Sequence, residues 1–111
     1  MLSDTRLTQP VDSSAASAIT LAAAPGAGKH IEIDHMELLP SGGANTLTFT
    51  GLSDGAGTAK TLVYVLSSGQ GYTYDKSADE ASTFVCLDNT ALTLTPSSAN
   101  RLTGAVNYRI V

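Results

Sequence analysis

The sequence has 111 residues, which is enough for one domain but too few for two domains that each bury their own core. Charged residues make up only 14% of the chain and the formal net charge is −4, so the surface must consist largely of Thr, Ser, Asn and Gly. Six scattered basic residues argue against nucleic-acid binding, and from the charged, polar start and the short apolar runs we expect neither a secretory signal nor a membrane span.

The N-terminal segment is polar, mixed in charge and without periodicity, which is typical of an extended arm that stays mobile unless a partner holds it. The sequence therefore predicts an extended N-terminal arm, residues 1–16, followed by a single domain, residues 17–111. The arm residues that we expect to bind a partner are Thr5, Arg6, Leu7 and Thr8.

From residue 17 onward, segments of alternating apolar and polar residues are separated by Gly, Pro, Asn or Asp. This pattern predicts an all-β, antiparallel sandwich or barrel of about eight short strands. An alanine-rich segment comes first and would also permit a helical turn, but its alternation favours a strand. The expected strands lie near residues 18–23, 29–39, 45–50, 61–66, 72–74, 82–87, 92–95 and 106–111.

Two of these strands have unusual patterns. Ile31 and Ile33 share one face of their strand whereas Met36 and Leu38 share the other, which predicts a bulge near His35 or a strand packed on both sides over part of its length. Segment 61–66 is apolar on both faces, as expected for a central strand.

The last strand runs to the C-terminus, so we expect this end of the chain to be paired within a sheet. Outward-facing threonines elsewhere could supply hydrogen bonds at subunit contacts.

The sequence offers one candidate metal site and one candidate nucleophile. His30, Glu32 and Asp34 would project from one face of a strand and His35 and Glu37 from the other, which permits a metal site, although a solvated or subunit-facing polar surface is the plainer interpretation. The single cysteine, Cys86, shares a strand face with Phe84, so we expect a buried, unreactive thiol.

The remaining candidates are weak matches to known sites. Segment 25–30 is similar to a phosphate-binding loop but has His30 in place of Ser or Thr, so a turn is expected there. Asp75, Asp79 and Glu80 share one loop without a nearby base, and we interpret them as solvated. The sequence therefore predicts no enzyme, cofactor or metal. Tyr64, Tyr72 and Tyr74 could form an aromatic platform for sugars, or else lie at core edges or subunit contacts.

From about residue 18 to the C-terminus, the layout of the chain resembles a group of short phage virion proteins. An Ala-rich strand and a Gly-Lys turn lead into an alternating strand at residues 22–33, and the other matching segments are Gly69–Tyr72, Asn89–Leu94 and Leu102–Tyr108. The resemblance implies a jelly-roll-like sandwich, commonly a homotrimer, that decorates the outside of a phage head as a cement protein.

This resemblance yields the functional expectation. The protein would be made in the bacterial cytoplasm and then bind the major capsid protein, or another virion protein, on the exterior of the head, with no role for nucleic acid or membrane. Many modest contacts at symmetric sites would supply the affinity. The alternative is a module of a tail or fibre that binds a host-surface glycan, through the three tyrosines, or another virion protein.

Overall fold

The computed structural model describes residues 5–78 and 83–111, which contain eight strands and one short 3-10 turn. Strands dominate because short alternating segments are separated by turn-forming residues. The elements are β1 (Thr5–Ser13), β2 (Ile19–Ala22), β3 (Ile31–Ser41), β4 (Asn45–Ser53), β5 (Ala59–Leu66), β6 (Tyr72–Asp75), η1 (Lys76–Ala78), β7 (Leu92–Pro96) and β8 (Arg101–Ile110).

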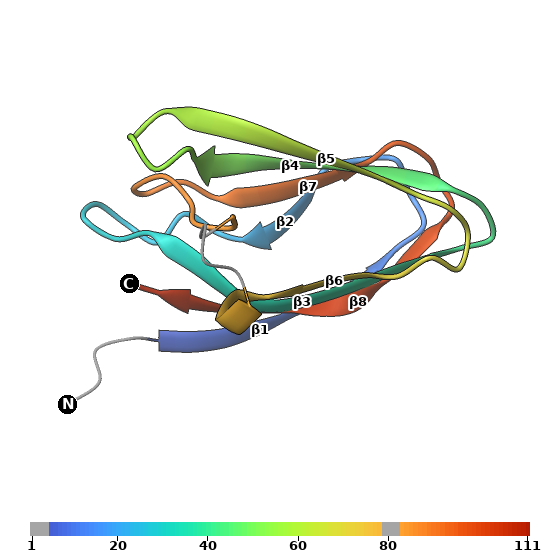
Figure 1. Ribbon diagram of the computed structural model, residues 1–111, viewed down its shortest axis with the longest axis horizontal. Coiled ribbons are helices and arrows are strands. Elements are labelled where there is room, and N and C mark those ends of the chain that lie inside the picture. Colours follow the sequence, from blue (N-terminus) through green and yellow to red (C-terminus); the bar gives the residue numbers. More distant parts are fainter. Residues whose placement is uncertain (1–4, 79–82) are drawn as a thin grey trace.

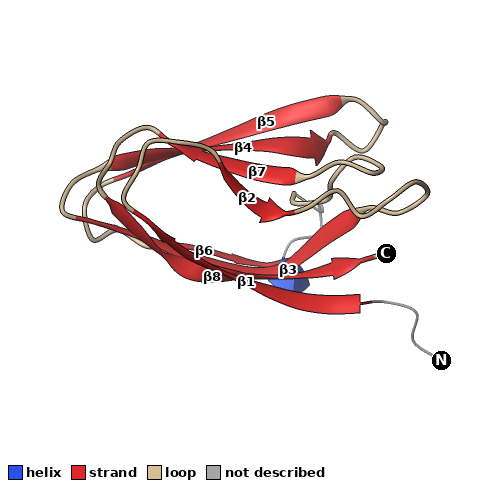
Figure 2. Ribbon diagram, turned by 180° about the vertical axis from the view of Figure 1, so that it is seen from behind, coloured by secondary structure: helices blue, strands red, loops and turns tan. Residues whose placement is uncertain are grey.

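The strands form two antiparallel sheets of four, with the orders β1-β8-β3-β6 and β2-β7-β4-β5. The two sheets lie face to face as layers, and the chain crosses between them repeatedly (Figures 1 and 2). This strand order is that of a jelly roll, in which two Greek keys are wrapped into a sandwich. The expected all-β, jelly-roll-like sandwich is confirmed.

The core consists of the inward-facing residues of both sheets. Leu47 and Phe49 of β4 and Leu92 and Leu94 of β7 are fully buried, as their alternation with threonine predicts. Each such side chain contributes on the order of 2 kcal/mol by its burial. Because the sequence has one cysteine and no disulfide, packing of this kind and backbone pairing hold the sandwich together.

The predicted N-terminal arm needs a correction. Residues Thr5–Ser13 form β1, which pairs with β8 along its whole length, from Thr5 opposite Ile110 to Ser13 opposite Leu102. The segment carries one deeply buried apolar residue, Val11, and mostly polar side chains besides, which suit a strand with one solvated face. Residues 5–13 therefore belong to the sandwich, and residues 1–4 lie outside the described part of the chain.

The bulge predicted in the second long alternating segment is confirmed. In the pairing of β3 with β8 the register shifts between Ile33 and His35, so one extra residue is accommodated there. As a result Ile33 and Met36 are both fully buried, although they are three positions apart. The same shift places His35 and Glu37 on the outer face with Glu32, which corrects the expectation that these groups point in opposite directions.

The segment around Phe84 is not the regular strand that the sequence predicts. Val85 and Cys86 form isolated bridges to Glu32 and Leu52, which belong to different sheets. Backbone hydrogen bonds alternate in the same way: Cys86 N–H donates to Ile31 O at 2.9 Å, and Leu87 N–H donates to Gly51 O at 3.0 Å. The segment therefore closes one end of the sandwich by joining β3 to β4. Ser82, at the start of the predicted strand, lies outside the described residues.

The prediction of a central position for segment 61–66 is wrong. This segment lies in β5, which is an edge strand and pairs, among the described strands, with β4 alone. Its pattern is that of a strand covered on both faces, but Val63 and Val65 are 56% and 75% exposed. The alternation shows which residues share a face, but it carries no information on how many neighbours a strand has.

The C-terminus is paired within a sheet, as expected. Backbone N–H groups of His30 and Val111 each donate to the carbonyl oxygen of the other, at 3.0 and 2.9 Å. These two bonds extend the β3–β8 ladder by one pair beyond Ile31 and Ile110. The last residue of the chain therefore contributes to the sandwich.

Candidate interaction surfaces

The outer surface of the β2-β7-β4-β5 sheet is built from threonines. The buried leucines of β4 and β7 alternate with threonines, so the threonine side chains all project away from the core. None of these positions carries a charge, although the protein as a whole is acidic. We call this surface the threonine face, and its members are Thr20, Thr46, Thr48, Thr50, Thr93 and Thr95.

Strand pairing aligns these threonines in rows across the sheet. Thr93 of β7 lies opposite both Thr20 of β2 and Thr50 of β4, and Thr95 lies opposite Thr48. Neighbouring strands are about 4.8 Å apart, and alternate residues along a strand repeat at about 6.8 Å. The threonine face is therefore a regular array of hydroxyl and methyl groups. The sequence showed that these residues face outward, but the rows depend on pairing between distant strands.

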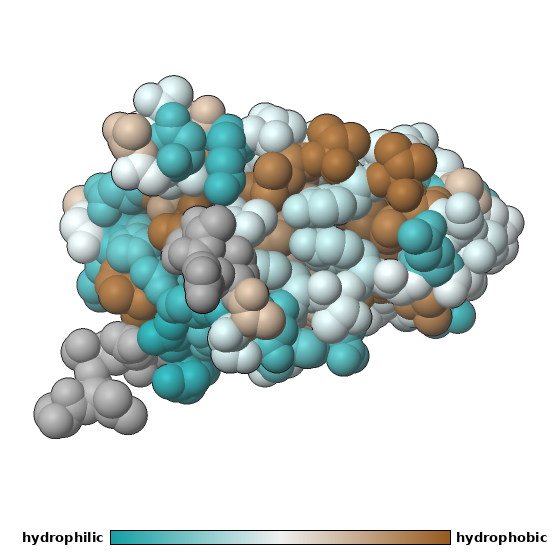
Figure 3. Space-filling model, viewed as in Figure 1, coloured by the Kyte–Doolittle hydropathy of each residue, from teal (hydrophilic) through white to brown (hydrophobic). Residues whose placement is uncertain are grey.

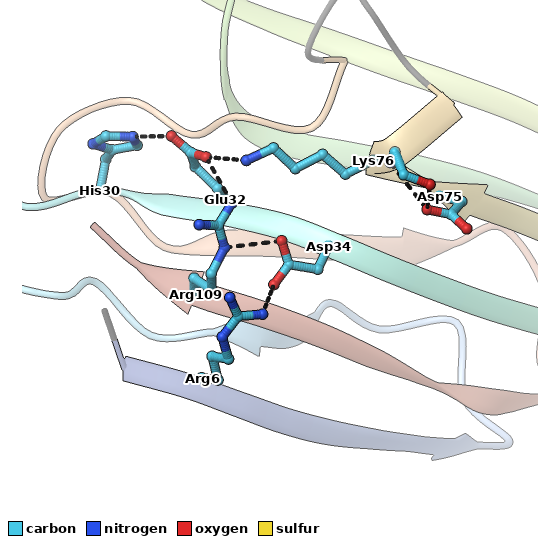
Figure 4. A network of polar contacts seen from close by, with 8 residues as sticks. Arg6, His30, Glu32, Asp34, Asp75, Lys76 and Arg109 are labelled. Atoms are coloured by element: carbon cyan, nitrogen blue, oxygen red, sulfur yellow. Dashed lines mark hydrogen bonds and ion pairs between the residues drawn. The ribbon is translucent and has the colours of Figure 1, made fainter. Parts of the chain in front are cut away.

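The other sheet carries a cluster of charges on its outer surface. The members come from four parts of the chain: Arg6 of β1, His30 just before β3 with Glu32 and Asp34 of β3, Lys76 of η1 and Arg109 of β8 (Figure 4). We call these residues the charged cluster. No local pattern in the sequence indicates the ion pairs of Arg6, Lys76 and Arg109, because their carboxylate partners lie between 28 and 77 positions away along the chain.

Glu32 and Asp34 each have more than one cationic neighbour. Glu32 accepts hydrogen bonds from Lys76 Nζ and, at 2.8 Å, from His30 Nε2, while Arg109 Nη2 lies 3.4 Å from its Oε1. Asp34 Oδ1 accepts from Arg109 Nε at 2.9 Å, and its Oδ2 lies 3.6 Å from Arg6 Nη1. The carboxylates thus neutralise the cations of β1 and β8 that would otherwise repel each other across adjacent strands.

The pKa of Glu32 reflects two opposing effects. Partial burial raises the pKa, but hydrogen bonds from Lys76 and His30, together with the positive charges of both, lower it by more. The net result is a pKa below the ordinary value of 4.5. Glu32 is therefore ionised and committed to ion pairs, which suits a structural role better than proton transfer.

The metal interpretation of the β3 side chains gains no support from this geometry. Within residues 5–78 and 83–111, no three His, Cys, Asp or Glu side chains converge as a ligand set. His30 and Glu32 bond to each other, and His35 Nε2 lies 3.1 Å from Glu37 Oε1. These side chains therefore form a polar outer surface on β3, which is the plainer of the two interpretations of the sequence.

Three of the four N-terminal residues expected to bind a partner line a shallow hollow of about 300 Å³. Arg6, Leu7 and Thr8 form one wall, and Asp34 and His35 of β3 lie opposite them. Leu7 is exposed, and Thr8 Oγ1 donates to Asn107 Oδ1 of β8 at 3.0 Å. A partner contact at these residues stays a prediction. For the fourth, Thr5, the structure describes only the backbone, which pairs with β8.

The three tyrosines pack into the sandwich and do not form an open platform. Tyr64 and Tyr72 have ring centroids 4.4 Å apart, and Tyr74 is buried with its ring edge against Phe84 at 4.8 Å. Tyr64 also meets Phe49, at 5.9 Å. The tyrosines therefore lie at the edge of the core, one of the two arrangements that the sequence permits, and each ring contacts other aromatic rings.

The remaining candidates have structural roles. Lys29 N–H donates to Gly26 O at 3.2 Å, so the segment similar to a phosphate loop is a turn. Cys86 is buried, and burial raises the pKa of its thiol to about 12. Asp75 is exposed and accepts from Ser77 Oγ at 2.8 Å. Asp79 and Glu80 lie outside the described residues.

The chain is similar in structure to a protein of bacterial spore appendages. No protein-family model matches the chain, and no curated protein matches its sequence. A solved structure described as "Bacillus endospore appendages form a novel family of disulfide-linked pili" contains a chain that matches with a TM-score of 0.50 and 19% identity, over 96% of this chain and 85% of that one. This likeness shows the fold. In the described part of the chain, no helix is long and apolar enough to cross a membrane.

Proposed function

We propose that this protein is a non-enzymatic structural protein of a virus particle, a decoration or cement protein bound to the outside of a phage head. The observation that carries the proposal is the threonine face. It is a regular and uncharged surface on an acidic protein, and the central part of a protein interface is depleted in charge. The partner is the major capsid protein or another virion protein.

The fold supports this role in a general way. Jelly rolls bury both sheets against each other and give a compact module with short connections, and they recur in capsid proteins. The structural relative described as a pilus is also part of an assembly, although at 19% identity the likeness supports the fold and not a shared partner. This protein's one cysteine is buried, so its assembly would not depend on disulfides between subunits.

A homotrimer is the proposed unit on the head. Three copies related by symmetry present three threonine faces at once, so that modest contacts add up to firm attachment. The protein would be made in the bacterial cytoplasm and leave the cell with the released particle.

Co-sedimentation with expanded phage heads that lack decoration tests the proposal. We expect wild-type protein to sediment with the heads, and Thr48→Lys with Thr95→Lys to prevent this, because two charges would be buried in the contact. The matched control is Leu39→Lys, at an exposed position of β3 in the other sheet, which should still bind, and Leu7→Lys tests the N-terminal residues separately. Wild-type protein that stays in the supernatant would overturn the proposal. Loss of binding by Leu7→Lys alone would move the contact to the N-terminal residues.

A further inference from the structure

The four edges of the two sheets differ in how well they are protected against pairing with another strand. Natural proteins protect edges with prolines, charges, bulges or short strands. β1 contains Pro10 and the charged Arg6 and Asp12. β2 has four residues and a register shift between Thr20 and Ala22, and β6 has four residues and ends at η1.

The β5 edge lacks these protections from Leu62 to Leu66. Among the described strands β5 pairs with β4 alone, and from Thr61 to Leu66 it contains no proline and no charge. The register shift between β4 and β5 lies at Thr61, between the pairs Phe49–Leu62 and Leu52–Lys60. The five residues Leu62–Leu66, which pair regularly on one side, therefore present backbone groups to solvent on the other side.

The side chains of β5 also fit a strand that is covered. Leu62 and Tyr64 pack toward the core, while Val63 and Val65 on the opposite face are largely exposed. Hydrophobic residues gather along the upper margin of the molecule in Figure 3, where Figure 1 places β5. An unprotected backbone edge beside exposed branched apolar side chains is the combination that drives strand addition.

We infer that β5 pairs with β5 of a second copy of this chain, antiparallel and about a two-fold axis, to join two four-stranded sheets into one. The sequence of β5 is complementary to itself in this arrangement. With Val63 opposite Val63 of the second copy, Thr61 lies opposite Val65 and Leu62 opposite Tyr64, so each pair combines residues of the same face. A shift by two residues, with Tyr64 opposite Tyr64, preserves the same match.

The charge distribution favours the same partner. The one charged residue of β5, Lys60, lies at the start of the strand, and in an antiparallel pair it comes opposite Leu66, far from the lysine of the second copy. An isologous contact also closes both open edges at once, so no further copy can be added there. A contact between the β5 edge and a different edge of the next copy would instead leave one edge open on each copy and favour fibres.

This contact is separate from head binding and from the proposed trimer. A two-fold contact alone gives a dimer, and combined with a trimer it gives a hexamer, so an even number of copies is expected in either case. Native mass spectrometry and sedimentation equilibrium, over micromolar to millimolar concentration, measure that number.

Val65→Lys is the variant that tests the edge. A lysine on the outer face of an edge strand opposes pairing, and the exposure of Val65 means that the fold should tolerate it, which a thermal unfolding curve checks. We expect this variant to have half the wild-type mass, and Val65→Thr to keep the full mass. The control Leu39→Lys, at an exposed apolar position of β3 in the other sheet, should also keep it.

Three results would overturn the inference: a monomeric wild-type protein, an assembly with an odd number of copies, or a wild-type assembly whose mass Val65→Lys leaves unchanged. Monomeric wild-type protein that still binds phage heads would assign the β5 edge to a different protein. Failure of head binding with an even-numbered assembly would leave the inference intact.

Cysteine cross-linking defines the register. Directly opposite residues in an antiparallel pair are close enough for a disulfide. Val63→Cys should cross-link to itself in the first register, whereas the shifted register requires a mixture of Val63→Cys and Val65→Cys. The native Cys86 is buried, so wild-type protein gives the background. Absence of cross-linking in both cases would contradict β5 pairing.

Discussion

Arg109 of β8 donates from Nε to Asp34 Oδ1 at 2.9 Å and also lies within 3.4 Å of Glu32, so one partly buried guanidinium joins two carboxylates of β3. Arg109→Met retains most of the side chain's apolar packing but removes the charge. We expect the free energy of unfolding to fall by about 2 kcal/mol, because two shielded carboxylates lose a charged donor. Chemical denaturation measures this change.

Arg101→Met is the matched control for that substitution. Arg101 pairs with Asp12 on the exposed surface of the same sheet, where both groups remain hydrated after the pair is broken. Its effect should therefore be clearly smaller than that of Arg109→Met. Equal effects of the two substitutions would mean that the charged cluster has no special role in stability.

The lowered pKa of Glu32 predicts acid sensitivity. Because the carboxyl releases its proton more readily in the folded protein, its stabilising contribution is complete above pH 4.5 and is lost as the pH falls through the lower folded pKa. The free energy of unfolding of Glu32→Gln should therefore depend less on pH below 4.5 than that of wild type. Hydrogen bonds also lower the pKa of Asp54 and Asp75, so some acid sensitivity should remain. If the unfolding free energies of wild type and Glu32→Gln changed with pH in parallel, Glu32 would not be the source of the acid sensitivity.

Asn45 is the buried polar side chain that connects β4 to the loop after β7. Its Oδ1 accepts from the backbone N–H groups of Ser97 at 2.9 Å and Ser98 at 3.3 Å, and its Nδ2 donates to Asn100 O. Asn45→Ala removes these hydrogen bonds, although Ser97 N–H keeps its bond to Thr46 O, and should cost about 2 kcal/mol in unfolding free energy. Asn107→Ala, at an exposed position of β8, should change it far less.

The sequence predicts β4 and β7 well, because a short segment of alternating apolar and polar residues can bury its apolar side chains in one way only. Leu47 and Phe49, and again Leu92 and Leu94, are separated by threonine, so placing the apolar residues inside fixes both faces of the strand. The face change after Ile33 was also informative, because it located the bulge within two residues. These features depend on residues close together in the chain.

Features that depend on distant residues were not predictable in the same way. The polar residues of β1 show no periodicity and therefore predict an arm, but β8 supplies pairing along the whole length of the segment. β5 was placed centrally because both faces are apolar, which a second copy would explain as well as an internal neighbour. The charged cluster required Arg109 to meet Asp34, 75 positions earlier, and no local pattern indicates that contact.

Gly104 lies where the backbones of β8 and β3 leave no room for a Cβ, and its replacement should be costly. Its φ is +150°, and a Cβ at this position would lie 1.8 Å from Glu37 O. Gly104→Ala should therefore lower the unfolding free energy by more than about 3 kcal/mol, because the backbone of β3 must move. Gly55→Ala is the control: its φ is +91°, but a Cβ there meets nothing within 4 Å, so it reports the backbone strain alone. Similar effects of both substitutions would exclude the steric cause.

Cys86 should react with thiol reagents at the rate at which the protein unfolds. Its thiol is buried and has a pKa of about 12, so at pH 8 roughly one molecule in ten thousand carries the reactive thiolate, and the reagent has no access to it. Mass spectrometry of alkylated samples should show slow labelling of folded protein, accelerated by denaturant. A variant with Ala56→Cys, in the exposed loop between β4 and β5, should be labelled at its new thiol at once. Rapid labelling of Cys86 in the folded protein would mean that the segment joining β3 to β4 opens locally. The backbone hydrogen bonds of Cys86 and Leu87 would then not keep this end of the sandwich closed.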